Sequence, residues 1–125
     1  MIWRIKNMEL TREEAISKHR KMWNWIADRI EEEKEDQDIE DLKIEYCHDE
    51  EVRVKNNCFC CGYTNCVCVF CPIKWESKVE NYMCIDEYKE NDSEGIYSIC
   101  CDETDWREQA KLARKIANLP ERENV

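Results

Sequence analysis

A run of cysteines between residues 58 and 71, CFCCGYTNCVCVFC, constrains this chain more than any other feature. It contains two C-x-x-C pairs separated by six residues. Two residues between thiolates let a tight turn aim both sulfurs at one ion, and a second turn completes a tetrahedral shell. The spacing therefore predicts a zinc ion bound by Cys58, Cys61, Cys68 and Cys71. Because such a closed shell leaves no position for water or substrate, we expect the zinc to be structural.

Several alternatives to this ligand set stay open. Cys60 or Cys66 could replace a member of a regular pair, and an iron or iron–sulfur centre would use the same thiolates. Gly62 follows Cys61 directly and is expected at a positive φ in the turn. A second metal site could use residues outside the two pairs; otherwise these pack as small buried hydrophobes. The candidates for it are Cys47, His48, Cys60, Cys66, Cys84, Cys100 and Cys101.

The charge of the chain limits its partners. The 125 residues, which are expected to form a single domain 1–125, carry a formal net charge of −10. Phosphate binding requires clustered Lys and Arg, so a direct nucleic-acid partner is not expected, whereas a protein with a basic surface is. The sequence has no signal peptide or apolar run of membrane-spanning length, so no membrane is expected. A cytoplasmic location follows, and its reducing conditions favour metal binding over disulfides.

Two amphipathic helices are predicted, one near each end. The first, at about 12–34, begins with a capping box of Thr11 and Glu14 and carries one apolar stripe. Its members are Ala15, Ile16, His19, Met22, Trp23, Ile26, Ala27 and Ile30. The second, at about 105–119, begins at Asp105 and buries a face with small alanines that allows the two helices to pack together. This face contains Trp106, Ala110, Ala113, Ile116 and Ala117, widened by Leu112 and Leu119.

The middle of the chain is predicted to be β-structure. Apolar residues alternate with charged ones around Ile44 and Val52, which predicts a hairpin leading into the zinc loop over about 43–75. A further strand is expected over 95–101, and Trp75 is expected to shield the metal from water. The predicted fold is therefore α+β: a small zinc-stapled domain with two packed helices and short strands around a four-cysteine loop.

An acidic run covers residues 31–41, EEEKEDQDIED. It is expected to form a helix end and turn, where carboxylates oppose the helix macrodipole. Either the run is only a solvated surface, or it is an acidic face that docks into a basic groove of a partner.

Three stretches resemble uncharacterised small cysteine-rich, zinc-binding proteins of phages and prophages of Gram-positive bacteria. They are HRKMWNWIAD at 19–28, CPIKW at 71–75 and AKLARKIANLPER at 110–122. The resemblance implies a mobile-element origin and a metal site that uses the two C-x-x-C pairs.

The sequence predicts a non-enzymatic protein, because no nucleophile, base and open metal occur together. His19 is expected to be a packed core histidine. The leading hypothesis is an acidic phage-type protein that binds and inhibits a host protein, as an anti-CRISPR-like, anti-defence inhibitor does. One alternative is a binder that sequesters a nucleotide immune signal, and another is a zinc-ribbon adaptor in transcription or replication. The sequestering protein would use Trp25, Trp75 or Trp106 with Arg20, Arg107 or Arg114.

Overall fold

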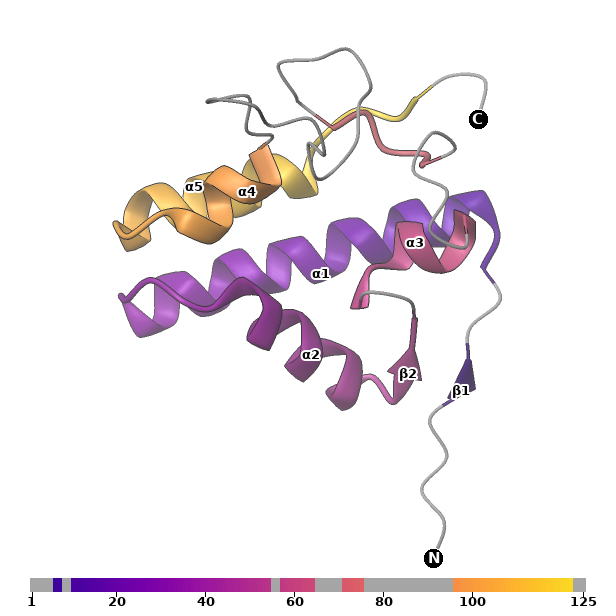
Figure 1. Ribbon diagram of the computed structural model, residues 1–125, viewed down its shortest axis with the longest axis horizontal. Coiled ribbons are helices and arrows are strands. Elements are labelled where there is room, and N and C mark those ends of the chain that lie inside the picture. The colour runs from indigo at the N-terminus through magenta and orange to yellow at the C-terminus, as the bar shows by residue number, and fades with distance from the viewer. Residues whose placement is uncertain (1–5, 8–9, 55–56, 65–70, 76–95, 123–125) are drawn as a thin grey trace, which may run out of the picture.

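A computed structural model describes residues 6–7, 10–54, 57–64, 71–75 and 96–122 (Figure 1). The described part consists mostly of helices, which lie around the long central helix α1. The elements are β1 Lys6–Asn7, α1 Arg12–Glu33, α2 Ile39–Asp49, β2 Val52–Arg53, α3 Phe59–Thr64, α4 Ile96–Asp102 and α5 Trp106–Ala117. The two strands pair in parallel.

Helix α1 is the element on which the others pack. Thr11 and Glu14 form the expected capping box, each side chain bonded to the other residue's backbone N–H. The helix ends at Lys34, which adopts the left-handed conformation with φ 54°. The eight residues of the predicted stripe, from Ala15 to Ile30, are the buried residues of this helix. Because these residues are three or four positions apart, they form one continuous helix face, and this face points into the core.

Helix α5 packs against α1, with α4 beside it (Figure 1). Its buried alanines, Ala110, Ala113 and Ala117, leave room for the two helix backbones to approach. Asp105 caps the helix by accepting the N–H of Arg107 at 2.9 Å. Trp106 lies only partly buried at the helix start, whereas Trp23 on α1 is a fully buried core residue.

The prediction of an α+β fold with strands around a zinc loop is wrong. Residues expected in a hairpin form α2, and in the described part of the chain strand is confined to β1 and β2. Asp38 caps α2 by accepting the N–H of Asp41, and the buried residues of α2 recur at helical spacing. They are Ile39, Leu42, Lys43 and Cys47. Alternation around Ile44 was misleading because Ile44 is an exposed residue of a short helix.

The strand expected over 95–101 is also absent, because residues 96–102 form α4. The buried residues of α4 are Ile96, Tyr97 and Cys100. They are one and then three positions apart, which places them on one face of a helix. The hydroxyl of Tyr97 accepts a hydrogen bond of 2.9 Å from the Lys43 ammonium and donates one to Glu40. These contacts fasten α4 to α2.

Gln109 is a fully buried amide that the apolar pattern did not reveal. Its oxygen accepts the backbone N–H of Gln37 at 2.8 Å. Its nitrogen donates to the carbonyls of Gln37 at 2.9 Å and Cys100 at 3.2 Å. One side chain on α5 therefore holds both the α1–α2 connection and the end of α4.

We expect Gln109→Leu to lower the free energy of unfolding by about 2–4 kcal/mol, because the N–H and carbonyl of Gln37 lose their partner and the carbonyl of Cys100 keeps only the bond from Glu103. The measurement is the urea midpoint, followed by far-UV circular dichroism. Gln37→Ala is the control, since the bonds of Gln37 to Gln109 come from its backbone; it should stay within about 0.5 kcal/mol of wild type. Equal midpoints for the two variants would contradict this role.

Candidate metal centre

Four buried cysteines lie together beside α1, and we call Cys58, Cys60, Cys61 and Cys71 the thiol cluster. Cys58 directly precedes α3, which packs on α1, and Cys60 and Cys61 lie in the first turn of α3. Cys71 begins the segment 71–75. Three predicted ligands, Cys58, Cys61 and Cys71, are thus brought together, whereas Cys68 lies outside the described residues.

The Cys60 thiol lies between two other sulfurs. Its single S–H can be donated to Cys58 or to Cys71, and these two contacts raise the pKa of Cys60 well above its usual value. The same bonds lower the pKa of Cys71 and, together with donation from Cys61, lower that of Cys58 well below its usual value. The cluster therefore favours thiolates at Cys58 and Cys71, which is the form that binds metals.

Backbone N–H groups also point at these two sulfurs. The N–H of Cys61 bonds to the Cys58 sulfur, and the N–H of Ile73 bonds to the Cys71 sulfur, and each bond lowers the pKa of the accepting thiol. The Cys61 amide lies three residues after Cys58, and the Ile73 amide lies two residues after Cys71. Amides in such positions can stabilise the negative charge that a thiolate keeps in a metal site.

Aromatic side chains cover the cluster. The Trp75 ring lies 5.4 Å from the imidazole of His19 and 6.5 Å from the ring of Trp23, with both contacts edge-on. Trp75 is almost completely buried, and its indole N–H, which meets no hydrogen-bond geometry with a described residue, is still near enough to the Cys71 sulfur to lower the pKa of Cys71. Trp75 thus lies beside Cys71, and its shielding of a metal stays a prediction.

The cluster fits a metal ion by chemistry, although its side chains would have to reorient. Within the described ranges, no three Cys, His, Asp or Glu side chains already converge on an ion position. The thiols instead bond to one another, and a metal would replace these contacts as the thiols release protons. Cys60 and Cys61 are neighbours on a helix and diverge by about 100°, so one ion takes only one of them. At most three described thiols could therefore bind one ion, and only after their side chains reorient.

Comparison of the chain with models of protein families, with curated proteins and with solved structures finds no match. Its function must therefore be argued from its own residues. Of the helices that the structure describes, none has the length and apolar character needed to cross a membrane.

Gly62 has a different role from the one expected. Among the described glycines none has a positive φ, and Gly62 lies inside α3. A Cβ at this position would come within 3.0 Å of Cγ1 of Val54. Gly62 is therefore needed for the close approach of α3 to the segment after β2.

The remaining described cysteines do not extend the cluster into a second metal site. Cys100 donates to the carbonyl of Gln109 at 3.7 Å, and burial raises its pKa to about 12. Burial also raises the pKa of Cys47 and of Cys101 to about 11. His48 is exposed, and Cys66 and Cys84 lie outside the described residues. The described thiols here behave as protonated, packed side chains.

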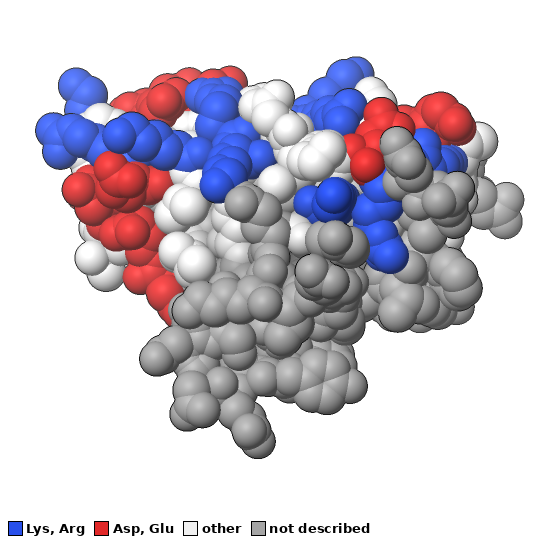
Figure 2. All heavy atoms as spheres, turned by 90° about the horizontal axis from the view of Figure 1, so that it is seen from above, with Lys and Arg blue, Asp and Glu red and all other residues white. Residues whose placement is uncertain are grey.

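The acidic run is divided between two helices. Asp38 caps α2, and Glu40 and Asp41 lie in its first turn, where negative charge is favourable. Glu31 pairs with Arg114 at 2.7 Å. The other acidic side chains of the run are exposed and form no ion pair with a described residue. We call Glu32, Glu33, Glu35, Asp36 and Asp41 the acidic tip. On the face seen in Figure 2, acidic side chains lie at this end of the molecule with Lys and Arg beside them.

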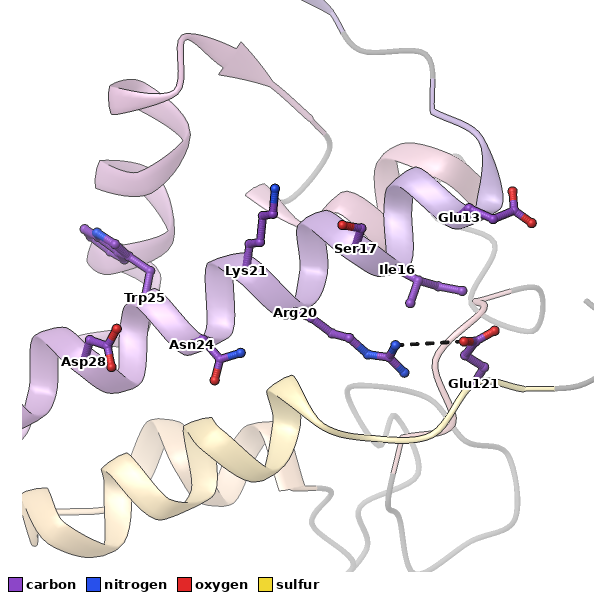
Figure 3. A pocket seen from close by; sticks show the side chains of 9 residues that line it. All are labelled: Glu13, Ile16, Ser17, Arg20, Lys21, Asn24, Trp25, Asp28 and Glu121. Atoms are coloured by element: carbon purple, nitrogen blue, oxygen red, sulfur yellow. Dashed lines mark ion pairs between the residues drawn. The ribbon is translucent and has the colours of Figure 1, made fainter.

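An open groove of about 590 Å³ runs along the exposed face of α1 (Figure 3). Trp25 lies at one end, and Arg20 and Lys21 lie between Trp25 and the carboxylate of Glu121. Arg20 is 3.9 Å from Glu121 and donates to the carbonyl of Leu119. The groove therefore unites one aromatic and one cation that the sequence proposed for a small-molecule site.

The other proposed small-molecule residues are not in this groove. Trp75 is buried beside the thiol cluster, and Arg107 stacks on Trp106 at 4.7 Å. Arg114 is held by Asp28 and Glu31. The structure thus brings together only part of the proposed set.

Proposed function

We propose that this chain is a non-enzymatic, metal-stapled acidic protein that binds a basic surface of a host protein and inhibits it. In this proposal the thiol cluster holds one zinc ion, which stabilises the fold, and the acidic tip makes the contact. The proposed setting is the host cytoplasm and the proposed role is anti-defence, in keeping with the resemblance to phage and prophage proteins.

The observation that carries this proposal is the position of Glu32 and Glu33. They lie in the last turn of α1, which has no basic residue to offset the helix macrodipole. Each carboxylate there costs roughly 0.3–1 kcal/mol of stability. Both carboxylates attract Arg29, one turn earlier on α1, and they form no ion pair with a described residue. Exposed charges that oppose the macrodipole and are not held in an ion pair are suited to a contact outside the chain.

The proposal predicts opposite effects of one substitution on stability and binding. Glu32→Gln with Glu33→Gln should raise the free energy of unfolding by roughly 0.5–2 kcal/mol, because two unfavourable charge–dipole interactions disappear. The same variant should lose inhibition. The measurement pairs urea unfolding with plaque counts of a targeted phage on bacteria that carry an active CRISPR nuclease and express this chain.

The matched control is Asp49→Asn with Glu50→Gln, which removes two charges at the C-terminal end of α2. This control should keep the plaque count of wild type. If the wild-type chain fails to restore plaques, the anti-CRISPR role is wrong. If both double variants inhibit equally, the acidic tip is not the contact.

A second candidate function is the sequestration of a nucleotide signal, and the groove along α1 favours it. Trp25 offers an aromatic ring and Lys21 an exposed ammonium that forms no ion pair with any described residue. Against it, Tyr46 and Arg29 already pack on Trp25. A nucleotide retained by the purified protein, and lost in Trp25→Ala, would support this function over the first.

A further inference from the structure

The face of α1 that lines the groove carries a cation and a carboxylate on either side of a tryptophan (Figure 3). Lys21 and Asp28 are both exposed, and they lie about 10.5 Å, or two turns, apart along the helix. This spacing places both side chains on the same side of α1. Trp25 lies between them and is half-buried. One helix face thus presents a cation, an aromatic ring and a carboxylate in that order.

The Trp25 ring is held in place by its neighbours. The Tyr46 ring lies 5.3 Å from it, and the Arg29 guanidinium lies 5.3 Å from its centroid. An aromatic side chain that is fixed in advance loses little conformational entropy on binding, and such residues are frequent anchors at the centre of protein interfaces. The exposed part of Trp25 is therefore suited to a protein contact.

The two charges beside Trp25 can take a further partner. Lys21 forms no ion pair with a described residue. Asp28 accepts a bond of 2.9 Å from Arg114, but its side chain is 62% exposed. A carboxylate can accept several hydrogen bonds, so Asp28 can bind a second cation while it keeps Arg114.

The charge of the groove fits a copy of the same chain. The lining residues have a formal charge of −1, whereas the whole chain has −10. The charged lining residues are Arg20 and Lys21 against Glu13, Asp28 and Glu121. Two chains of the same sign repel each other, and this repulsion is reduced where the charges of the facing surfaces complement each other. A nearly balanced face in an acidic chain therefore favours a contact between two copies.

We propose that the groove face of α1 pairs with the same face of a second copy, with the two helices antiparallel. A two-fold axis that passes between Asn24 and Trp25 lies midway between Lys21 and Asp28. Each Lys21 then faces Asp28 of the partner subunit, and the two Trp25 rings lie near the axis. A parallel pair in register would instead place like charges together. This pairing goes beyond the proposed function, and the charges that carry it do not belong to the acidic tip, so either can fail without the other.

An exchange of charges tests this pairing. Sedimentation velocity over a concentration series should show that the wild-type chain forms dimers and that added salt weakens them. Lys21→Glu and Asp28→Lys each place like charges opposite each other, so each should weaken dimerisation by about tenfold. The variant with both substitutions has the two charges exchanged, and it should dimerise as the wild-type chain does.

Lys111→Glu is the matched control, because it makes the same charge change on α5, where Lys111 pairs with Glu108 at 3.3 Å. This control should leave dimerisation unchanged. Asp28→Lys also removes a partner of Arg114, so far-UV circular dichroism checks that each variant is folded. Lys21→Glu breaks no ion pair with a described residue and tests the pairing even if Asp28→Lys unfolds.

Three results would overturn the pairing. The first is a wild-type chain that stays monomeric at every concentration. The second is a Lys21→Glu variant that dimerises as well as the wild-type chain. The third is a folded double variant that dimerises no better than Lys21→Glu alone.

Discussion

Cys58→Ser is expected to lose its metal and to unfold. Structural zinc contributes about 10–16 kcal/mol of apparent binding free energy in small metal-dependent folds, which matches or exceeds the stability of a domain of this size. The Cys58 sulfur receives bonds from Cys60 and Cys61, and these bonds favour its thiolate form, which binds metals. Zinc content and far-UV circular dichroism of the purified variant give the two readouts, and excess chelator should unfold the wild-type chain in the same way.

The matched control for this loss is Cys101→Ser. Cys101 lies on α4, is half-buried and does not belong to the thiol cluster. It should bind one zinc and remain folded. A Cys58→Ser protein with wild-type helicity and stability would show that the cluster is ordinary core packing.

Trp23→Ala is expected to lower the free energy of unfolding of the zinc-loaded protein by about 3–5 kcal/mol, because it opens a large cavity in the core. The Trp23 ring is 1% exposed and makes edge-on contacts with Trp75 and Tyr97 at 6.5 and 5.8 Å. Each aromatic pair adds about 0.5–1.5 kcal/mol beyond area burial. Urea unfolding, followed by helicity, measures the change.

Trp106→Ala provides the comparison, since it removes the same side chain from the partly exposed start of α5. Its expected cost is about 1–2 kcal/mol, from partial burial and the contact with Arg107. Similar losses in both variants would contradict a core centred on Trp23.

The sequence predicts long helices better than short ones in this chain. Helix α1 has six turns, so its apolar stripe repeats often enough to identify every buried residue. Helices α2 and α4 span only 11 and 7 residues, and alternation over so few positions resembles a strand. The burial of Lys43 and Gln109 depends on Tyr97 and Gln37, partners far away in the sequence, and no local pattern predicts it.

The candidate site was predictable in its cysteines but not in its surroundings. The C-x-x-C spacing identified the segment and three members of the thiol cluster, but it could not show that Cys60 lies between Cys58 and Cys71. His19 is the packed core histidine that the sequence predicted, and its Nε2 lies 3.1 Å from the carbonyl oxygen of Ile116 on α5. Its position at the centre of an apolar stripe was the available indication, because a polar side chain there requires a buried partner.

Native mass spectrometry of the protein, purified gently from bacterial cells, tests the central claim most directly. We expect the mass of the chain plus one zinc ion, lowered by the protons that the thiols release on binding. A chain that carries no metal and stays folded with its thiols reduced would contradict the metal-stapled account.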